Sequence, residues 1–265
     1  MSTVTMLPSI IQGGMGIAVS NWRLANAVSR CGQLGVVSGT ALDTVFVRRL
    51  QDGDSGGHLR RAMEHFPLPA VAQDALRRYF LPEGRAGAPY KELPMYRHGV
   101  RPERERLTML ACFVEVFLAK EGHDGGVGIN LLTKIQLPTL ASLYGAMLAG
   151  VDVVLMGAGI PKEIPAALDA LAEGRPASLR FEVEGQAPDV TEHMRLDPMR
   201  QSTRLAAGRD EVVPAPRGHL LEIETEHPVR EMIPVVKIAQ EPAVDALFSE
   251  SGLDLLDIHA VCLRM

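Results

Sequence analysis

The sequence predicts an α/β fold built on a parallel β-sheet. The chain has 265 residues, 46% of them hydrophobic, which is enough to bury a sizeable core. Short apolar runs alternate with segments of helical periodicity along much of its length. Parallel strands need a crossover connection, so this alternation predicts a parallel sheet with helices outside it.

The first strand–helix–strand unit stands near the N-terminal end of the sequence. Residues 8–12 are a short apolar run suited to a buried strand, and residues 21–30 repeat apolar side chains at helical spacing. Ser20 is the predicted N-cap of that helix. Residues 34–38 are a second apolar, β-branched run, so the unit closes as a parallel pair of strands joined by a helix.

The middle of the chain interrupts this alternation and then resumes it. Residues 44–106 are expected to form a helical insertion, because charged helical segments there precede a Pro/Gly-rich passage. Residues 185–216 are weakly patterned, whereas 219–227 alternate like a half-buried strand. Between the insertion and residue 185, further strand and helix candidates occupy residues 106–120, 127–132, 141–149, 151–157, 163–172 and 177–183.

Charge and composition argue against two classes of partner. The net charge is -5 at pH 7, so there is no basic surplus to attract nucleic acid. The most apolar stretch, 140–160, is interrupted by Asp152 and several glycines, so neither export nor membrane insertion is expected. Cys31, Cys112 and Cys262 lack the spacing of a metal site or a disulfide framework. We therefore expect no bound metal, reduced thiols and a cytoplasmic protein.

A glycine cluster, QGGMG, stands where the first predicted strand ends. It does not fit a dinucleotide fingerprint, because Val19 occupies the place of the third glycine, and no P-loop sequence occurs. One interpretation is structural, since glycine permits a tight turn or a positive φ. The other is that bare backbone at the carboxyl end of a strand lets a flat ring approach closely. In that case the amide of Gln12 and the thioether of Met15 suit contacts to a heteroaromatic ring.

Three long motifs carry a family resemblance. They read "IIQGGMGIAVSNWRLANAVSRCGQLGVVSGTALD", "RRLQDGDSGGHLRRAMEHFP" and "FVEVFLAKEGHDGGVGINLLTKIQLPTLASLYGAMLAGVDVVLMGAGIP". Over about residues 7–198 the chain resembles the nitronate monooxygenase (2-nitropropane dioxygenase-like) family. The closest branch is similar to the flavin-dependent enoyl reductase subunits of polyunsaturated fatty acid synthases. The resemblance implies a TIM-type (β/α) barrel that binds FMN, with the flavin ring over the carboxyl ends of the strands.

The resemblance also implies which residues contact the cofactor. Asn130 matches a strand-end asparagine whose amide binds the flavin or the substrate, although an Asn that only caps a turn is the structural alternative. Lys134 and Gln136 belong to the same motif and are expected near the mouth of the site. The residues matched to cofactor-binding positions are Gln12, Gly13, Gly14, Met15, Gly39, Asn130 and Gly157.

The implied activity is FMN-dependent oxidation of a nitronate or a similar small substrate, with NAD(P)H as another source of electrons. An alternative is trans-acting enoyl reduction on an acyl-carrier-bound substrate in polyunsaturated fatty acid or polyketide synthesis. For an acidic carrier, a basic docking patch is available from Arg48, Arg49, Arg60 and Arg61, unless these form a solvated helical face. A further alternative is an inactive barrel that acts as an interaction subunit.

The sequence departs from the family pattern in its C-terminal part. A (β/α)₈ barrel has eight strands, whereas only about four or five candidates occur up to Val183. The chain has no AGGH sequence and no late glycine pair, so no catalytic base is assigned and weak FMN retention is expected. Residues 199–265 form a divergent segment without an assigned role. A truncated chain, a divergent barrel, and a barrel completed by a second copy or a partner subunit all stay open.

Overall fold

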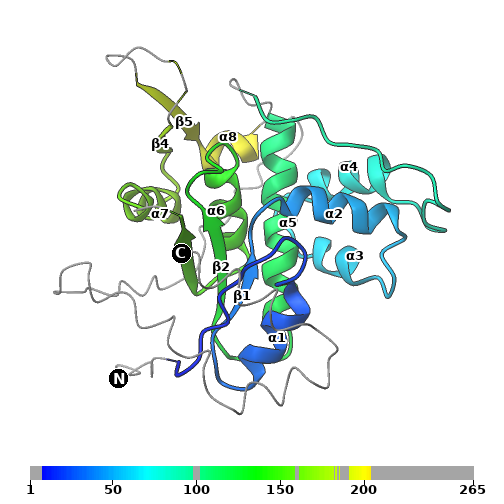
Figure 1. Cartoon of the computed structure of the whole chain (residues 1–265). Helices are drawn as coiled ribbons and strands as arrows, with labels where there is room; N and C mark the ends of the chain where they lie inside the picture. Colours follow the sequence, from blue (N-terminus) through cyan, green and yellow to red (C-terminus); the bar gives the residue numbers. More distant parts are fainter. Residues whose placement is uncertain are drawn as a thin grey trace.

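A parallel sheet forms the centre of the molecule (Figure 1). The computed structural model describes residues 8–97, 102–158, 161–181, 183, 185 and 191–203. The strand order is β1 (Gly35–Ser38), β2 (Val127–Leu132) and β3 (Val153–Gly157). Ile11 forms a parallel bridge with Leu34, so the chain before the first helix extends the sheet beside β1. The predicted parallel pairing of the two N-terminal apolar runs is therefore confirmed.

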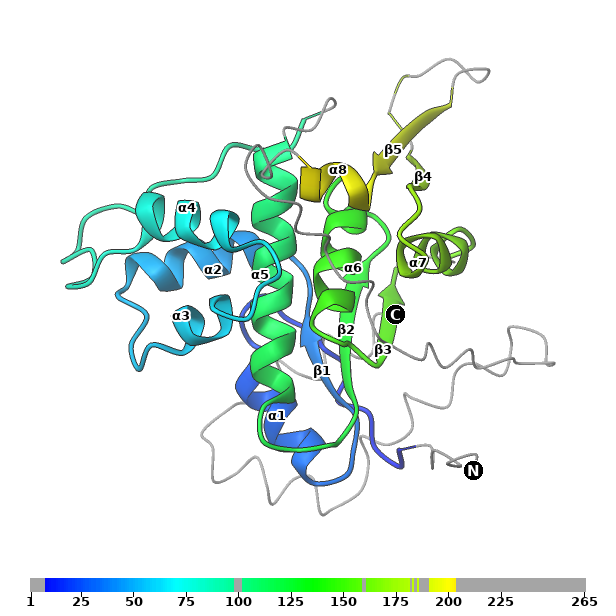
Figure 2. The same ribbon diagram turned by 180° about the vertical axis from the view of Figure 1, so that it is seen from behind.

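Helices α1 (Trp22–Arg30), α5 (Pro102–Lys120) and α6 (Thr139–Leu148) pack together against the sheet (Figure 2). Their interface with the sheet is apolar, because Val37 and Ile129 are completely buried. Gly145 lets α6 approach α5 closely, since a Cβ there would lie 2.2 Å from the Met109 carbonyl oxygen. Where α5 and α6 cross, the two helices therefore leave no room for a side chain at position 145.

The start of α1 differs from the sequence prediction. Its N-cap is Asn21, whose side chain accepts hydrogen bonds from the backbone N–H groups of Arg23 and Leu24. The predicted cap, Ser20, instead donates its hydroxyl to the Met15 carbonyl oxygen at 2.6 Å. Both residues have the chemistry of a cap, and the extended backbone at Asn21 decides which one performs it.

Among the described residues, three helices lie between β1 and α5, in the segment for which the sequence predicts a helical insertion. These are α2 (Leu42–Gln51), α3 (His58–Met63) and α4 (Pro69–Tyr79), which pack together on one side of α5 (Figures 1 and 2). Phe66 and Phe113 meet edge to face, with ring centroids 5.1 Å apart, and join the insertion to α5. One hydrophobic core therefore runs from the insertion into the sheet.

The chain beyond β3 forms α7 (Ile164–Ala172), β4 (Ala177–Phe181), β5 (Glu192–Leu196) and α8 (Pro198–Thr203). The strand predicted at 177–183 is confirmed, but β4 pairs with β5 in a separate antiparallel sheet rather than with β3. The α/β class is confirmed, and β1, β2 and β3 form an open parallel sheet among the described residues; the barrel stays a prediction. Residues 219–227 and Cys262 lie outside the described residues. Among the described helices, none has the length and apolarity to cross a membrane.

Candidate functional site

The carboxyl ends of the parallel strands meet at one rim of the sheet, the carboxyl rim. Gln12 follows the bridge at Ile11, Gly39 follows β1, and Gly157 ends β3. Asn130 lies in β2, and its carbonyl oxygen accepts a hydrogen bond from Gly39 N at 2.8 Å. The prediction that these residues share one rim is therefore confirmed.

Asn130 is the central polar group of this rim. It is 6% exposed, and its Nδ2 donates to the Gly13 carbonyl oxygen at 2.6 Å and lies 3.3 Å from Met15 Sδ. Its Oδ1 is buried and has no hydrogen-bond partner in the described part of the chain. An unsatisfied buried acceptor costs about 1–3 kcal/mol. The atom is therefore suited to accept a hydrogen bond from a bound ligand.

Gln12 uses both ends of its amide within the protein. Its Oε1 accepts from Val36 N at 3.0 Å, and its Nε2 donates to Ser20 Oγ at 2.9 Å. Because Ser20 in turn bonds to Met15, the amide anchors both ends of the glycine loop against β1. Gln12 thus positions the loop that carries Gly13 over Asn130.

Packing within the chain explains two of the predicted glycines. Gly14 has a φ of +69°, and a Cβ there would lie 2.5 Å from Val36 Cγ1 and 2.9 Å from Asn130 Cβ. At Gly39 a Cβ would lie 2.4 Å from Leu131 Cδ2. The structural interpretation therefore accounts for both positions, because any side chain would push the loop or strand away from its neighbour.

The other two predicted glycines leave more space. A Cβ at Gly13 would have only Met15 Cγ within reach, at 3.9 Å. At Gly157 the nearest atoms would be Leu132 Cδ2 at 3.2 Å and Asn130 Oδ1 at 3.6 Å. Gly13 and Gly157 therefore stand on either side of the Asn130 amide, where a ligand could approach the backbone.

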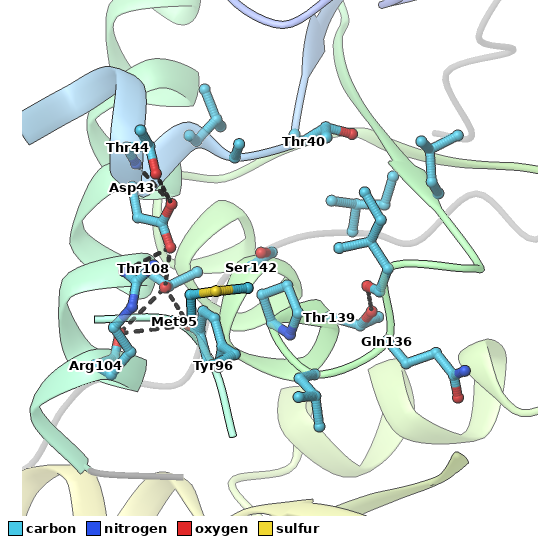
Figure 3. A pocket seen from close by; sticks show the side chains of 18 of the residues that line it. Thr40, Asp43, Thr44, Met95, Tyr96, Arg104, Thr108, Gln136, Thr139 and Ser142 are labelled. Atoms are coloured by element: carbon cyan, nitrogen blue, oxygen red, sulfur yellow. Dashed lines mark hydrogen bonds and ion pairs between the residues drawn. The ribbon is translucent and has the colours of Figure 1, made fainter. Parts of the chain in front are cut away.

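A cleft of about 690 Å³ opens beside the carboxyl rim (Figure 3). Its walls are the loop from β1 into α2, the segment 93–96, the first turns of α5, and the loop from β2 into α6. Gly39 is the one residue of the predicted cofactor set that lines it. Lys134 and Gln136 also line the cleft, as expected for residues near the mouth of a site. We refer to this space as the rim cleft.

A polar cluster that sequence reasoning missed lies on one wall of the rim cleft (Figure 3). Asp43 is 4% exposed, and its Oδ2 lies 2.7 Å from Arg104 Nη1 and accepts from Thr108 Oγ1 at 3.0 Å. The Tyr96 hydroxyl bonds to Thr108 Oγ1, and burial raises the pKa of Tyr96 above its ordinary value. The available signal was Asp43 itself, the one charged residue in the stretch 31–47, since a charge that becomes buried needs a partner.

A second cleft, of about 450 Å³, lies between the end of β3 and the start of α7. Lys134, Gln136 and Thr139 line both clefts, so the loop from β2 into α6 separates them. Lys162 and Arg180 add basic groups to the second cleft. Among the described residues, no group of His, Cys, Asp and Glu is arranged to hold a metal ion.

The arginines of the predicted carrier patch are mostly engaged within the protein. Arg48 lies with its guanidinium 5.0 Å from the Tyr90 ring centroid. The other three form ion pairs at 2.6, 3.1 and 2.5 Å, namely Arg49 with Glu115, Arg60 with Asp54 and Arg61 with Glu121. Contacts within the chain therefore explain the positions of these arginine side chains, and a carrier protein is not needed to explain them.

Comparisons of the chain with protein-family models, curated proteins and solved structures found no match. The resemblance to nitronate monooxygenases therefore stays a prediction from the sequence motifs. The geometry of the carboxyl rim supplies the structural observations on which a function can be proposed.

Proposed function

We propose that this chain is a flavin-dependent oxidoreductase of the nitronate monooxygenase type, acting on a nitronate or a similar small organic substrate. The observation that carries the proposal is the buried Asn130 amide, whose Oδ1, between Gly13 and Gly157, has no donor among the described residues. A ligand that fits must bring an N–H group to this point and remain flat enough to lie against backbone.

The ring of a flavin has these properties. Its pyrimidine edge carries an N–H group between two carbonyl groups, and Asn130 Oδ1 is placed to accept from such a donor. Gly13 leaves space beside the amide, and the Met15 thioether lies 3.3 Å from Asn130 Nδ2, where it can contact a ring edge. When bound, FMN supplies the redox chemistry, accepting electrons from the substrate or a reduced nicotinamide and passing them to oxygen.

The phosphate of FMN fits the described residues less well. A phosphate is best held by free N–H groups at a helix N-terminus. At the rim, α2 carries Asp43 in its first turn, the N-cap of α6 is Pro138, and the N-cap of α7 is Glu163. The Glu163 carboxylate repels an anion, the Asp43 carboxylate occupies the start of α2 together with its partner Arg104, and Pro138 has no N–H to donate. The described chain therefore favours binding of the ring over binding of the phosphate.

Titration of the protein with FMN and with riboflavin, followed by quenching of flavin fluorescence, tests the proposal. We expect both to bind, with dissociation constants within about fivefold of each other, because the phosphate gains few charge-assisted hydrogen bonds. Asn130→Leu should weaken both by about tenfold or more, since the buried acceptor is lost. Oxygen uptake with an alkyl nitronate then tests the reaction itself.

A matched amide at the other end of the sheet provides the control. Asn26 Nδ2 donates to the carbonyl oxygens of Ala119 at 3.1 Å and Glu121 at 2.8 Å. Asn26→Leu should lower the free energy of unfolding and leave the flavin dissociation constants unchanged. Absence of binding by either flavin would reject the proposed cofactor. Binding of FMN alone would contradict the expected small contribution of the phosphate and would show that the chain holds this group.

The enoyl reductase alternative has no comparable support from the structure. Its expected docking patch depends on basic groups that are free to meet an acidic carrier, and three of the four arginines are already ion-paired. We therefore retain the nitronate-type oxidoreductase as the proposed function.

A further inference from the structure

We infer that the rim cleft binds a small organic anion with an apolar body, of which a medium-chain carboxylate is the simplest example. The inference rests on the shape, lining and charge of the cleft, and it does not depend on the proposed flavin. A volume of about 690 Å³ lies within the range of small-molecule sites, which is about 300–1,000 Å³.

The lining of the cleft is mainly apolar. Leu42 and Leu131 form buried parts of its wall, while three of its apolar side chains are exposed to solvent. These are Met95 at 85%, Ile135 at 42% and Val183 at 46% exposure. Nine large apolar side chains are exposed in the described chain, and this one cleft collects three of them. Covering them with an apolar ligand would remove that surface from water, which stabilises the complex.

The charge of the cleft selects the head group of the ligand. Three charged residues line it, and Asp43 is already neutralised by its ion pair with Arg104. Lys134 is exposed and forms no ion pair with any described residue, so it leaves the cleft with a net positive charge. This cation favours an anionic group on the ligand.

The arrangement of these features orients the ligand. Lys134, Gln136 and Thr139 line both clefts and so lie on the wall that the clefts share. Figure 3 shows the Asp43 cluster on the opposite wall from Gln136 and Thr139. The anionic head is therefore placed at the Lys134 side, close to the N-terminus of α6. The apolar body extends past Ile135 toward Met95 and Val183, the solvent-exposed part of the lining.

Ligand-observed NMR titration of the full chain tests this inference with octanoate as the probe. Uncharged 1-octanol and the short anion acetate serve as comparison ligands. We expect saturable binding of octanoate that weakens as salt is added, because an exposed charge pair is screened. Octanol should bind more weakly than octanoate, and acetate should show no saturation. No saturable octanoate binding would overturn the inference.

Two substitutions separate the contributions of charge and apolar surface. Lys134→Met should weaken octanoate binding about three- to fivefold and leave octanol unchanged. Ile135→Asp should weaken both ligands by about tenfold or more, since it replaces apolar surface with a charge. Equal binding of octanoate and octanol in the wild type would refute the anion site, and saturable acetate binding would refute the apolar site.

Matched substitutions outside the cleft control for general effects. Arg175 is 60% exposed on its side chain, so Arg175→Met removes one positive charge from an exposed site. Leu81 is 41% exposed, close to the 42% of Ile135, so Leu81→Asp repeats the apolar-to-acidic change elsewhere. Neither control should change octanoate binding. If a control weakens binding as much as its partner in the cleft, the site is not where we place it.

Discussion

The two ends of the parallel sheet differ in how completely their polar groups are paired. At the amino rim, where the strands begin, Asp152 Oδ2 accepts from Lys120 Nζ at 2.5 Å and from Val127 N at 2.8 Å. Ser29 Oγ donates to the Gly126 carbonyl oxygen at 2.7 Å, and His123 Nε2 lies 2.7 Å from the Ala119 carbonyl oxygen. Each of these groups closes a turn or joins a helix to a strand.

At the carboxyl rim, the polar groups are paired less completely. Asn130 Oδ1 is buried without a partner among the described residues, and Lys134 stands beside two clefts. Because satisfied polar groups stabilise a fold and unsatisfied ones cost free energy, the contrast supports the proposal that ligands bind at the carboxyl rim. This is the end at which parallel α/β folds place their ligands.

The largest expected change in stability comes from replacing one glycine at each end of the sheet, Gly35 at the amino rim and Gly157 at the carboxyl rim. A Cβ at Gly35 would lie 2.0 Å from the Ala25 carbonyl oxygen, whereas at Gly157 the closest atom would be 3.2 Å away. We expect Gly35→Ala to lower the free energy of unfolding by about 3 kcal/mol and Gly157→Ala by less than about 1 kcal/mol. Urea unfolding followed by circular dichroism measures both. Equal losses would show that the carboxyl rim is as tightly packed as the amino rim.

A smaller expected change, the loss of stability when the Cys112 thiol ionises, tests whether solvent from the rim cleft reaches the layer of helices. Cys112 is completely buried in α5, and burial raises the pKa of its thiol from 9.0 to about 12. Its neutral form is favoured in the folded state, so the stabilisation is complete below pH 9 and is lost as the pH rises toward 12. The loss should approach about 1.4 kcal/mol per pH unit, or about 2 kcal/mol between pH 9 and 10.5.

The control for this titration is Cys112→Ser, which keeps the size of the side chain and does not ionise in that range. We expect the difference between the two unfolding free energies to grow with pH above 9. A constant difference would mean that the thiol ionises normally in the folded protein and that water reaches it through the cleft. Rapid alkylation of Cys112 at pH 8, alongside the exposed Cys31, would lead to the same conclusion.

The smallest effect concerns the exposed ion pair of the amino rim. Arg61 Nη2 lies 2.5 Å from Glu121 Oε2, and the hydrogen bond to Glu121 raises the pKa of Arg61. Their side chains are 43% and 32% exposed, so solvent screens the interaction. Arg61→Met should change the free energy of unfolding by no more than about 0.5 kcal/mol. A loss above about 2 kcal/mol would show that pairing at this rim contributes more than exposed charges normally do.

Local pattern in the sequence was sufficient to predict most of the elements. The apolar run at 127–132 is β2 with the same bounds, and the stretch at 163–172 differs from α7 by one residue at its start. β5 and α8 were missed, because both are short and lie in a segment without a clear apolar period. The shared rim of Gln12, Gly39, Asn130 and Gly157 also followed from sequence, since the carboxyl ends of parallel strands must meet.

What only the tertiary structure decided is how these residues are used. Gln12 has the same amide as Asn130, yet its amide is bonded to Val36 and Ser20 while Asn130 Oδ1 has no described partner. The rim cleft is likewise assembled from segments 39–44, 93–96 and 131–139, which are far apart in the chain. Periodicity reports the exposure of neighbouring residues, whereas hydrogen-bond partners and cavities depend on how distant segments pack. The sequence by itself therefore determined the elements and their order, and packing decided which polar groups have a partner within the described chain.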